Sequence, residues 1–200
     1  MFCQRKCASR VWAGVVGLLL LAGGKPVGWG VDARRLVEDA RGQVGVTKGY
    51  DARWRKLSYP GGDVPMETGV CTDVVIRALR KQGIDLQRWV HEDMVAHFSR
   101  YPRNWGAVRA DFSIDHRRVP NLRTFFKRQG FAIPVGRRAE DFWAGDIVTW
   151  NLGKGVGHIG VVSDRRAPDN TPLVIHNIGL GVREEDVLFL FERTGHYRLH

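Results

Sequence analysis

The spacing of apolar residues changes part-way along this 200-residue chain. Up to about residue 130, apolar side chains recur at helical spacing. After residue 145 they fall in short β-rich runs separated by turn residues. Helices first and strands afterwards predict an α+β fold with a mostly antiparallel sheet. We expect the central helix, which begins at Cys71, to pack on that sheet.

The expected elements follow from capping residues, stop residues and periodicity. The expected helices are 32–44, 71–82, 85–101 and 120–130, and the expected strands are 147–150, 158–163, 173–176 and 187–191. Val44 is expected on the inner stripe of the first helix. In the second helix, Asp73 and Arg77 are expected to lie mostly away from the apolar face.

The first thirty residues have the order of a secretory signal. Arg5, Lys6 and Arg10 precede an uncharged run over residues 11–24, which is shorter than the about 20 residues of a membrane span. We expect residues 1–30 to be a signal peptide or N-terminal anchor and residues 31–200 to form a single domain. The protein would then be periplasmic or otherwise exported, and only an uncleaved leader would hold it to a membrane.

The charge of the chain bears on its partners. The formal net charge is +10, and because the first thirty residues hold four basic and no acidic side chains, the remainder carries +6. A moderately basic exported domain suits an anionic wall polymer, although a solvated basic surface has the same composition. No basic stripe with interleaved aromatic residues is present, so we expect no nucleic-acid partner. We expect a monomer.

Cys71 is the strongest candidate for chemistry. Removal of the leader would take Cys3 and Cys7 with it and leave Cys71 without a disulfide partner. A thiolate is the nucleophilic form of cysteine, and a helix N-terminus or a neighbouring imidazolium lowers the thiol pKa from about 8.5. His158 could supply that imidazole and then protonate a leaving amine. A buried structural cysteine is the alternative interpretation.

A third polar group should hold the far nitrogen of the imidazole. A hairpin turn centred at residue 167 would place His158 opposite His176, and a centre half a residue later would place it opposite Asn177. His176 is the expected orienting residue and Asn177 the reserve, with a substrate contact as its other role. Free amides at the helix start could stabilise an oxyanion.

Further residues are candidates for substrate contact. Tyr50 and Tyr59 lie in the loop before the cysteine and could donate a hydroxyl. Asp73 follows the cysteine closely, and its charge would oppose thiol ionisation unless it points away or caps the helix. Asp115 and His116 could contact substrate, although we favour a role in organising their loop.

Metal binding is an alternative use of the same side chains. Cys71, His158 and His176 could together ligate zinc, but this would quench the nucleophile. We therefore expect no metal and no cofactor.

Several motifs resemble the NlpC/P60 family of papain-like cysteine peptidases. That family pairs a helix start of the Asp-Cys-Ser type with a strand of the His-Val-Gly-Ile-Tyr type and a strand that ends in Ile-His. The matching stretches here are 70–73, 158–162 and 174–176, with 145–148 resembling the Gly-Asp-Leu-Val stretch of the family. Val70 stands where the family has aspartate.

Residues from about 32 to 200 resemble the DUF1287 family of exported bacterial proteins more closely. The segments that carry this resemblance are 69–75, 90–94, 114–122 and 175–179. The two resemblances imply a papain-like NlpC/P60 fold in which Cys71 is the nucleophile, His158 the base and His176 the third polar residue.

The wider resemblance implies hydrolysis of an amide in peptidoglycan stem peptides. We expect an exported cysteine amidase or endopeptidase acting on peptidoglycan or a related cell-envelope amide. Two alternatives stay open. The same thioester intermediate could be resolved by an amine, as in transglutaminase-type acyltransferases. The chain could also be a non-catalytic module that binds the cell wall on the same fold.

Overall fold

A computed structural model describes residues 29–199. The helices are α1 (Ala33–Arg41), α2 (Cys71–Arg80), α3 (Leu86–His97) and α4 (Val119–Arg128). The strands are β1 (Gly49–Tyr50), β2 (Thr68–Gly69), β3 (Ala132–Ile133), β4 (Ile147–Asn151), β5 (Gly157–Arg166), β6 (Pro172–Asn177), β7 (Val182–Glu185) and β8 (Glu192–Tyr197). Short 3₁₀ turns are η1 (Phe98–Arg100), η2 (Asn104–Gly106), η3 (Asp115–Arg117) and η4 (Ala139–Asp141).

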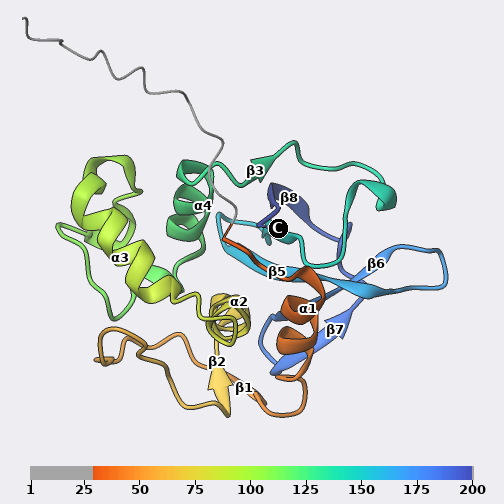
Figure 1. The fold of residues 1–200 in the computed structure, drawn as a ribbon, viewed down its shortest axis with the longest axis horizontal. Coiled ribbons are helices and arrows are strands. Elements are labelled where there is room, and N and C mark those ends of the chain that lie inside the picture. The colour runs from red at the N-terminus through yellow and green to blue at the C-terminus, as the bar shows by residue number, and fades with distance from the viewer. Residues whose placement is uncertain (1–28, 200) are drawn as a thin grey trace, which may run out of the picture.

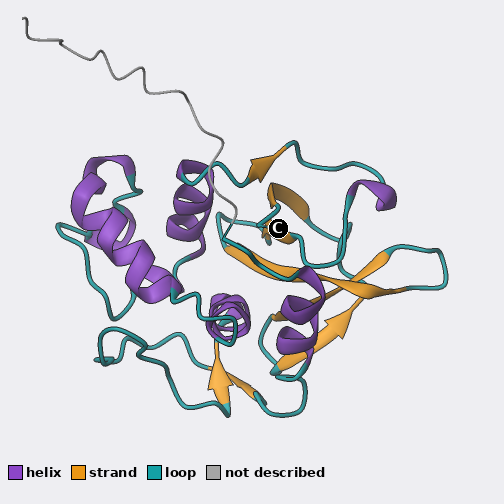
Figure 2. Cartoon of the chain, viewed as in Figure 1, coloured by secondary structure: helices purple, strands orange, loops and turns teal. Residues whose placement is uncertain are grey.

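The strands β3 to β8 form one sheet, and the helices pack beside it. The strand order is β3-β8-β4-β5-β6-β7, and every neighbouring pair is antiparallel. The helices α1 and α2 lie against β5 and β6, α4 contacts β5 and β8, and α3 lies beside α2 and α4 on the side away from the sheet (Figures 1 and 2). The predicted α+β class, with early helices packed on a late antiparallel sheet, is confirmed.

The sheet has an apolar cluster on each face. Ile159, Val161 and Ile175 belong to the main core, together with the inner residues of α1, α2 and α4. Val162 and Val174 belong to a second cluster with Phe142, Val148, Trp150 and Leu188. Because side chains alternate along a strand, adjacent residues of β5 fall in different clusters.

The helix boundaries largely follow the predicted caps. The carboxylate of Asp32 accepts a hydrogen bond from the Arg35 amide at 3.0 Å, and Asp85 caps α3 in the same way. Gly83 follows α2 with a φ of +80°, a conformation that suits glycine. The prediction for Val44 was wrong, because α1 ends at Arg41 and Val44 is 43% exposed.

The predicted outward orientation of Asp73 and Arg77 was also wrong. Both side chains are buried, because the segment between α1 and α2 wraps the side of α2 that faces away from the sheet. The Arg77 guanidinium donates to the carbonyls of Val64, Pro65 and Thr68 and pairs with Asp63. A helix covered on all sides cannot show the one-sided pattern that the prediction assumed.

The expected strand over residues 187–191 is not a strand. These residues form a turn between β7 and β8. Leu188 is fully buried in the second cluster, and its carbonyl accepts a hydrogen bond from the indole of Trp150 at 3.1 Å. The apolar residues here serve to cover the far face of the sheet, which explains a β-like composition without β structure.

The register between β5 and β6 differs from both predicted alternatives. Val161 pairs with Ile175 and Val162 with Val174, and an irregularity follows before Arg166 pairs with Pro172. Across this irregularity β5 advances by four residues while β6 advances by two, so the register moves by two residues. His176 therefore lies beside Gly160 rather than directly opposite His158. The two histidines still share a face, as a diagonal pair.

The expected leader over residues 1–30 lies almost wholly outside the described residues. Among residues 29–199, no helix combines the length and apolarity that a membrane crossing requires.

Candidate active site

Cys71 is the first residue of α2, and a buried ion pair holds the start of this helix. The Asp73 carboxylate accepts a hydrogen bond from the Val70 amide at 2.7 Å and receives Arg117 through two bonds of 2.9 Å. The side chains of Asp73 and Arg117 are only 4% and 2% exposed. Asp73 is thus a helix cap whose charge is neutralised by Arg117. In this arrangement the Asp73 charge opposes ionisation of the Cys71 thiol least.

The thiol of Cys71 is buried, and burial raises its pKa to about 12. The charge of Asp73 acts in the same direction, while hydrogen bonding from the amides of Ile159 and Thr72 and from the Tyr50 hydroxyl opposes the rise. The sequence predicted a lowered pKa from the helix start and an imidazolium. That prediction was wrong, because the desolvation of a thiolate outweighs the backbone donors.

The imidazoles of His158 and His176 form a buried pair. Nε2 of His158 lies 2.8 Å from Nδ1 of His176, and the rings meet edge to face with centroids 5.0 Å apart. Nε2 of His176 lies 3.3 Å from Oε2 of Glu185, within ion-pair distance but outside hydrogen-bond alignment. A chain of groups therefore runs from β5 through β6 to β7.

This chain selects a tautomer for each ring. The negative charge of Glu185, 3.3 Å away, favours a proton on Nε2 of His176, which leaves Nδ1 of His176 as an acceptor for the Nε2 proton of His158. His158 then has a bare Nδ1, which is the form of a general base. Burial lowers the pKa of His158 to about 3, with the second ring adding to the effect, so the ring is neutral near pH 7.

The sulfur of Cys71 meets β5 at the residue next to His158. It lies near the amide of Ile159, the residue that follows His158. The side chain of Ile159 faces the main core beneath α2, whereas His158, which pairs with Trp150, lies on the opposite face of the sheet, with the second cluster. Within the described part of the chain, no hydrogen bond joins the sulfur to either imidazole.

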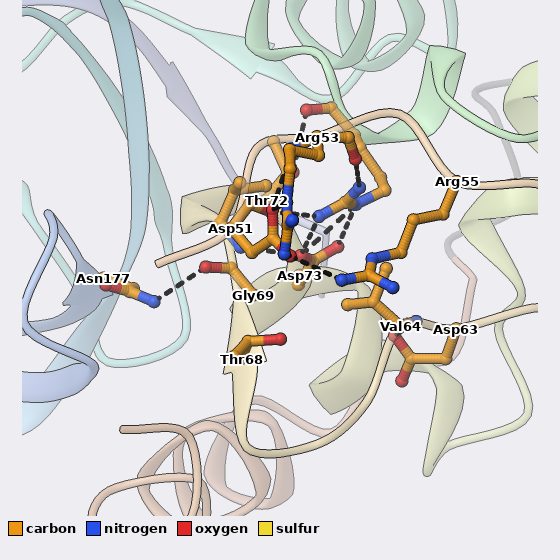
Figure 3. Close-up of polar contacts among 12 residues, drawn as sticks. Asp51, Arg53, Arg55, Asp63, Val64, Thr68, Gly69, Thr72, Asp73 and Asn177 are labelled. Atoms are coloured by element: carbon orange, nitrogen blue, oxygen red, sulfur yellow. Dashed lines mark hydrogen bonds and ion pairs between the residues drawn. The ribbon is translucent and has the colours of Figure 1, made fainter. Parts of the chain in front are cut away.

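Asn177 has a different role from His176. It points from β6 toward the helix side, where its amide donates to the carbonyls of Gly49 and Gly69, each at 3.1 Å. Figure 3 shows the contact of Asn177 with Gly69 beside the polar contacts of Asp73. Asn177 thereby ties the sheet to the parallel pair of β1 and β2, which positions Tyr50 and the residues before Cys71.

A cleft of about 490 Å³ opens at Cys71. Tyr50 is on its wall, 44% exposed. The lining residues are Tyr50, Ala52, Trp54, Val70, Cys71, Asn104, Trp105, Ile114, Arg117, Arg118, Val119, Pro120, Lys154, Gly155, Val156 and Gly157. The cleft lies between the N-termini of α2 and α4 on one side and the loop before β5 on the other.

Other residues proposed for substrate contact lie away from this cleft. Tyr59 packs on His91 and Phe112. Asp115 accepts the Asp111 amide within its own loop, in line with the structural role that we favoured. His116 is 2% exposed, and burial lowers its pKa to about 3.

Sequence reasoning missed several residues that shape the site. Arg117 and Arg118 stand inside a motif that carries the family resemblance, so a basic pair next to Asp115 was the available signal. Glu185 was missed because the one strand expected after His176 was placed at 187–191, beyond the end of β7. Trp105 and Lys154 lie in loops, where no periodicity marks a residue for function.

No metal site emerges from residues 29–199, since no three His, Cys, Asp or Glu side chains gather closely enough to hold an ion there.

Comparison with known proteins assigns the family. Residues 37–199 match DUF1287, a domain of unknown function. The chain belongs to the DUF1287 family. It is also 57% identical over 163 residues to the uncharacterized protein YijF of Escherichia coli (strain K12), an alignment that covers 82% of this chain and 80% of YijF.

Two solved structures are similar to this DUF1287 protein. NlpC1 of Trichomonas vaginalis matches 88% of the chain with a TM-score of 0.46 and 14% identity, and NlpC2 of the same organism matches 85% with a TM-score of 0.44 and 18% identity. The chain spans 46% and 48% of their respective lengths.

Proposed function

We propose that this protein is an exported cysteine amidase that hydrolyses an amide of peptidoglycan stem peptide or a related cell-envelope polymer. One observation carries the proposal. The thiol of Cys71, the first residue of α2, lines an open cleft, and its sulfur lies near the amide of Ile159, the residue that follows His158 of the histidine pair. Nucleophile, base and orienting group are the parts that acyl transfer through a thioester requires.

The resting site is neutral, so we propose that proton transfer accompanies attack. Nδ1 of His158 takes the thiol proton while the sulfur of Cys71 bonds to the substrate carbonyl carbon. The tetrahedral intermediate collapses, the C–N bond breaks, and His158 returns the proton to the leaving amine. Water, deprotonated by the same ring, then cleaves the thioester and restores the thiol.

This sequence requires a movement larger than a side-chain rotation. His158 lies on the face of β5 opposite the one that meets Cys71, so contact between sulfur and Nδ1 needs a shift of β5 against the start of α2, a step we assign to substrate binding. The amides of Ile159 and Thr72 lie near the sulfur, where they favour negative charge on the sulfur as its proton leaves.

Mass spectrometry of muropeptides tests the proposal. Purified peptidoglycan is incubated with the protein, with Cys71→Ala and with His158→Ala, and in parallel with an added amine such as glycine methyl ester. We expect new peptide termini from the unsubstituted protein and none from either variant. Amine-exchanged products in place of new termini would establish the acyltransferase alternative, and full turnover by Cys71→Ala would refute both enzymes.

The neutral site also favours a second candidate, a wall-binding module without catalysis. A thiol pKa raised to about 12 and an imidazole pKa lowered to about 3 describe a pair that is inert at rest. Co-sedimentation with insoluble peptidoglycan separates the two. Binding that is unchanged in Cys71→Ala, together with no product from the unsubstituted protein, would identify the module.

A further inference from the structure

The cleft at Cys71 is cationic. Three of its lining side chains, Arg117, Arg118 and Lys154, carry positive charge, and none of its lining residues is a carboxylate. Arg117 is already paired with Asp73 and donates to the carbonyl of Asp51 at 3.0 Å. The charges of Arg118 and Lys154 are therefore the ones available to a ligand.

Arg118 is held ready at the mouth of the cleft. Its guanidinium stacks on the ring of Trp105, with Cζ 4.5 Å from the centroid. A stacked guanidinium keeps its N–H edge free while losing little freedom when a ligand binds. Within residues 29–199 the Arg118 side chain makes neither an ion pair nor a hydrogen bond; the Asp115 carboxylate accepts the Asp111 amide and interacts with the Arg118 charge only at longer range.

Lys154 approaches from the opposite wall. It occupies the tip of a tight turn before β5, with a φ of +51°. Hydrogen bonds between Leu152 and Val156 and between Val156 and Gly153 close this turn. In the described part of the chain, Lys154 has no carboxylate partner, and it lines the cleft from an exposed turn, so its charge is available to a bound ligand.

We propose that Arg118 and Lys154 form an anion subsite, which makes the substrate class an amide that bears a free carboxylate close to the scissile bond. The inference rests on the function proposed above and adds the chemistry of the substrate. The fork of Arg118 fits a planar carboxylate, and Lys154 adds a second charge from the facing wall. Trp54 and Trp105 supply apolar surface for the neighbouring part of the substrate.

Alkylation of Cys71 tests the charge without any substrate. The full-length protein is treated at pH 8 and low salt with iodoacetate, an anion, or with iodoacetamide, its neutral counterpart. The modification of the Cys71 peptide is followed by mass spectrometry, which separates it from Cys3 and Cys7. The ratio of the two rates reports the potential that an anionic reagent meets at the sulfur.

We expect Arg118→Gln and Lys154→Gln each to lower the iodoacetate-to-iodoacetamide ratio roughly two- to fourfold, from Coulomb attraction over the width of the cleft. The ratio is the readout because losing a positive charge near the sulfur also lowers the thiolate fraction, which slows both reagents alike. Arg109→Gln and Arg137→Gln remove exposed charges outside the cleft and should leave the ratio unaltered. An unchanged ratio in both cleft variants, or an equal fall in the controls, would overturn the subsite.

A substrate arm separates this inference from the proposed enzyme. Native muropeptides are compared with muropeptides whose carboxylates are converted to carboxamides. Preference for the native form, lost in Arg118→Gln with Lys154→Gln, supports the subsite, whereas equal cleavage of both forms by the unsubstituted protein contradicts it. If neither form is cleaved, the proposed hydrolysis of peptidoglycan fails, and the alkylation ratio still decides the subsite.

Discussion

The buried environment of the Cys71 sulfur affects the thiol pKa more strongly than its position at the N-terminus of α2 does. The N-terminus of α2 and two backbone amides favour a thiolate, yet burial and the charge of Asp73 raise the thiol pKa to about 12. The free protein should therefore hold a neutral thiol beside a neutral His158.

This neutral state predicts a distinctive pH profile. We expect the rate of Cys71 alkylation by iodoacetamide to be low at pH 7 and to keep rising above pH 9, because each pH unit increases the thiolate fraction up to the thiol pKa. His158→Ala should change this profile little. A plateau reached below pH 7 would instead show a preformed thiolate–imidazolium pair.

The orienting chain behind His158 predicts a role for Glu185. Replacing Glu185 with Gln removes the charge that faces Nε2 of His176 at 3.3 Å, so both rings lose the preference for the tautomer that leaves His158 a free base. We expect kcat on muropeptides to fall roughly tenfold with KM little changed, as for other outer partners of functional histidines.

Two variants control this experiment. Arg183→Gln removes the ion-pair partner of Glu185 on the same strand and should leave kcat within about twofold, since that pair is solvent-exposed. Glu185→Asp should restore part of the rate. An equal loss in Arg183→Gln would show that the strand, and not the carboxylate, is responsible.

At the scale of elements, the ion pair between Asp73 and Arg117 joins η3 to the start of α2. Arg117 also donates to carbonyls of the segment that leads to β1, at Asp51 and Arg53. One guanidinium thereby holds three stretches of chain around the cysteine. In the sheet, the absence of a side chain at Gly160 lets His176 pack closely, because a Cβ at position 160 would lie only 3.1 Å from the Cβ of His176.

Breaking this pair should be costly. We expect Arg117→Leu to lower the free energy of unfolding by about 3–5 kcal/mol, since it leaves Asp73 charged and buried without a partner. Arg53→Leu is the matched control. Its side chain is 77% exposed in its pair with Asp51, and such pairs contribute about 0–1 kcal/mol. Urea unfolding followed by fluorescence measures both, and equal losses would contradict the argument.

At the scale of the whole molecule, buried histidines couple folding to pH. Burial lowers the pKa values of His158 and His116 to about 3, while the unfolded chain binds these protons near pH 6.5. The unfolded state therefore binds more protons throughout that window, and stability falls as the pH is lowered through it.

We expect the free energy of unfolding to decrease by about 1.4 kcal/mol per pH unit for each histidine between pH 6.5 and pH 3. His116→Gln should reduce this slope by the contribution of one proton, because the glutamine does not titrate. Denaturation midpoints measured from pH 7 to pH 4 test this. The same slope in the variant would show that His116 is already protonated in the folded state.

Much of the architecture follows from local pattern. Capping residues such as Asp32 and Asp85, the stop at Gly83 and the change from helical to strand periodicity depend on neighbours in sequence, so each could be predicted without a fold. The start of α2 at Cys71 and the strands that carry His158 and His176 belong to this group.

The features that only the tertiary structure decided depend on contacts between segments that are distant in sequence. A bulge in β5 sets the diagonal pairing of His158 with His176, and a wrapping loop buries Asp73. The raised thiol pKa likewise arises from atoms that the chain brings together only on folding. Local sequence encodes periodicity and caps because these are neighbour effects, whereas register, desolvation and the charge lining a cleft are sums over the whole packed molecule.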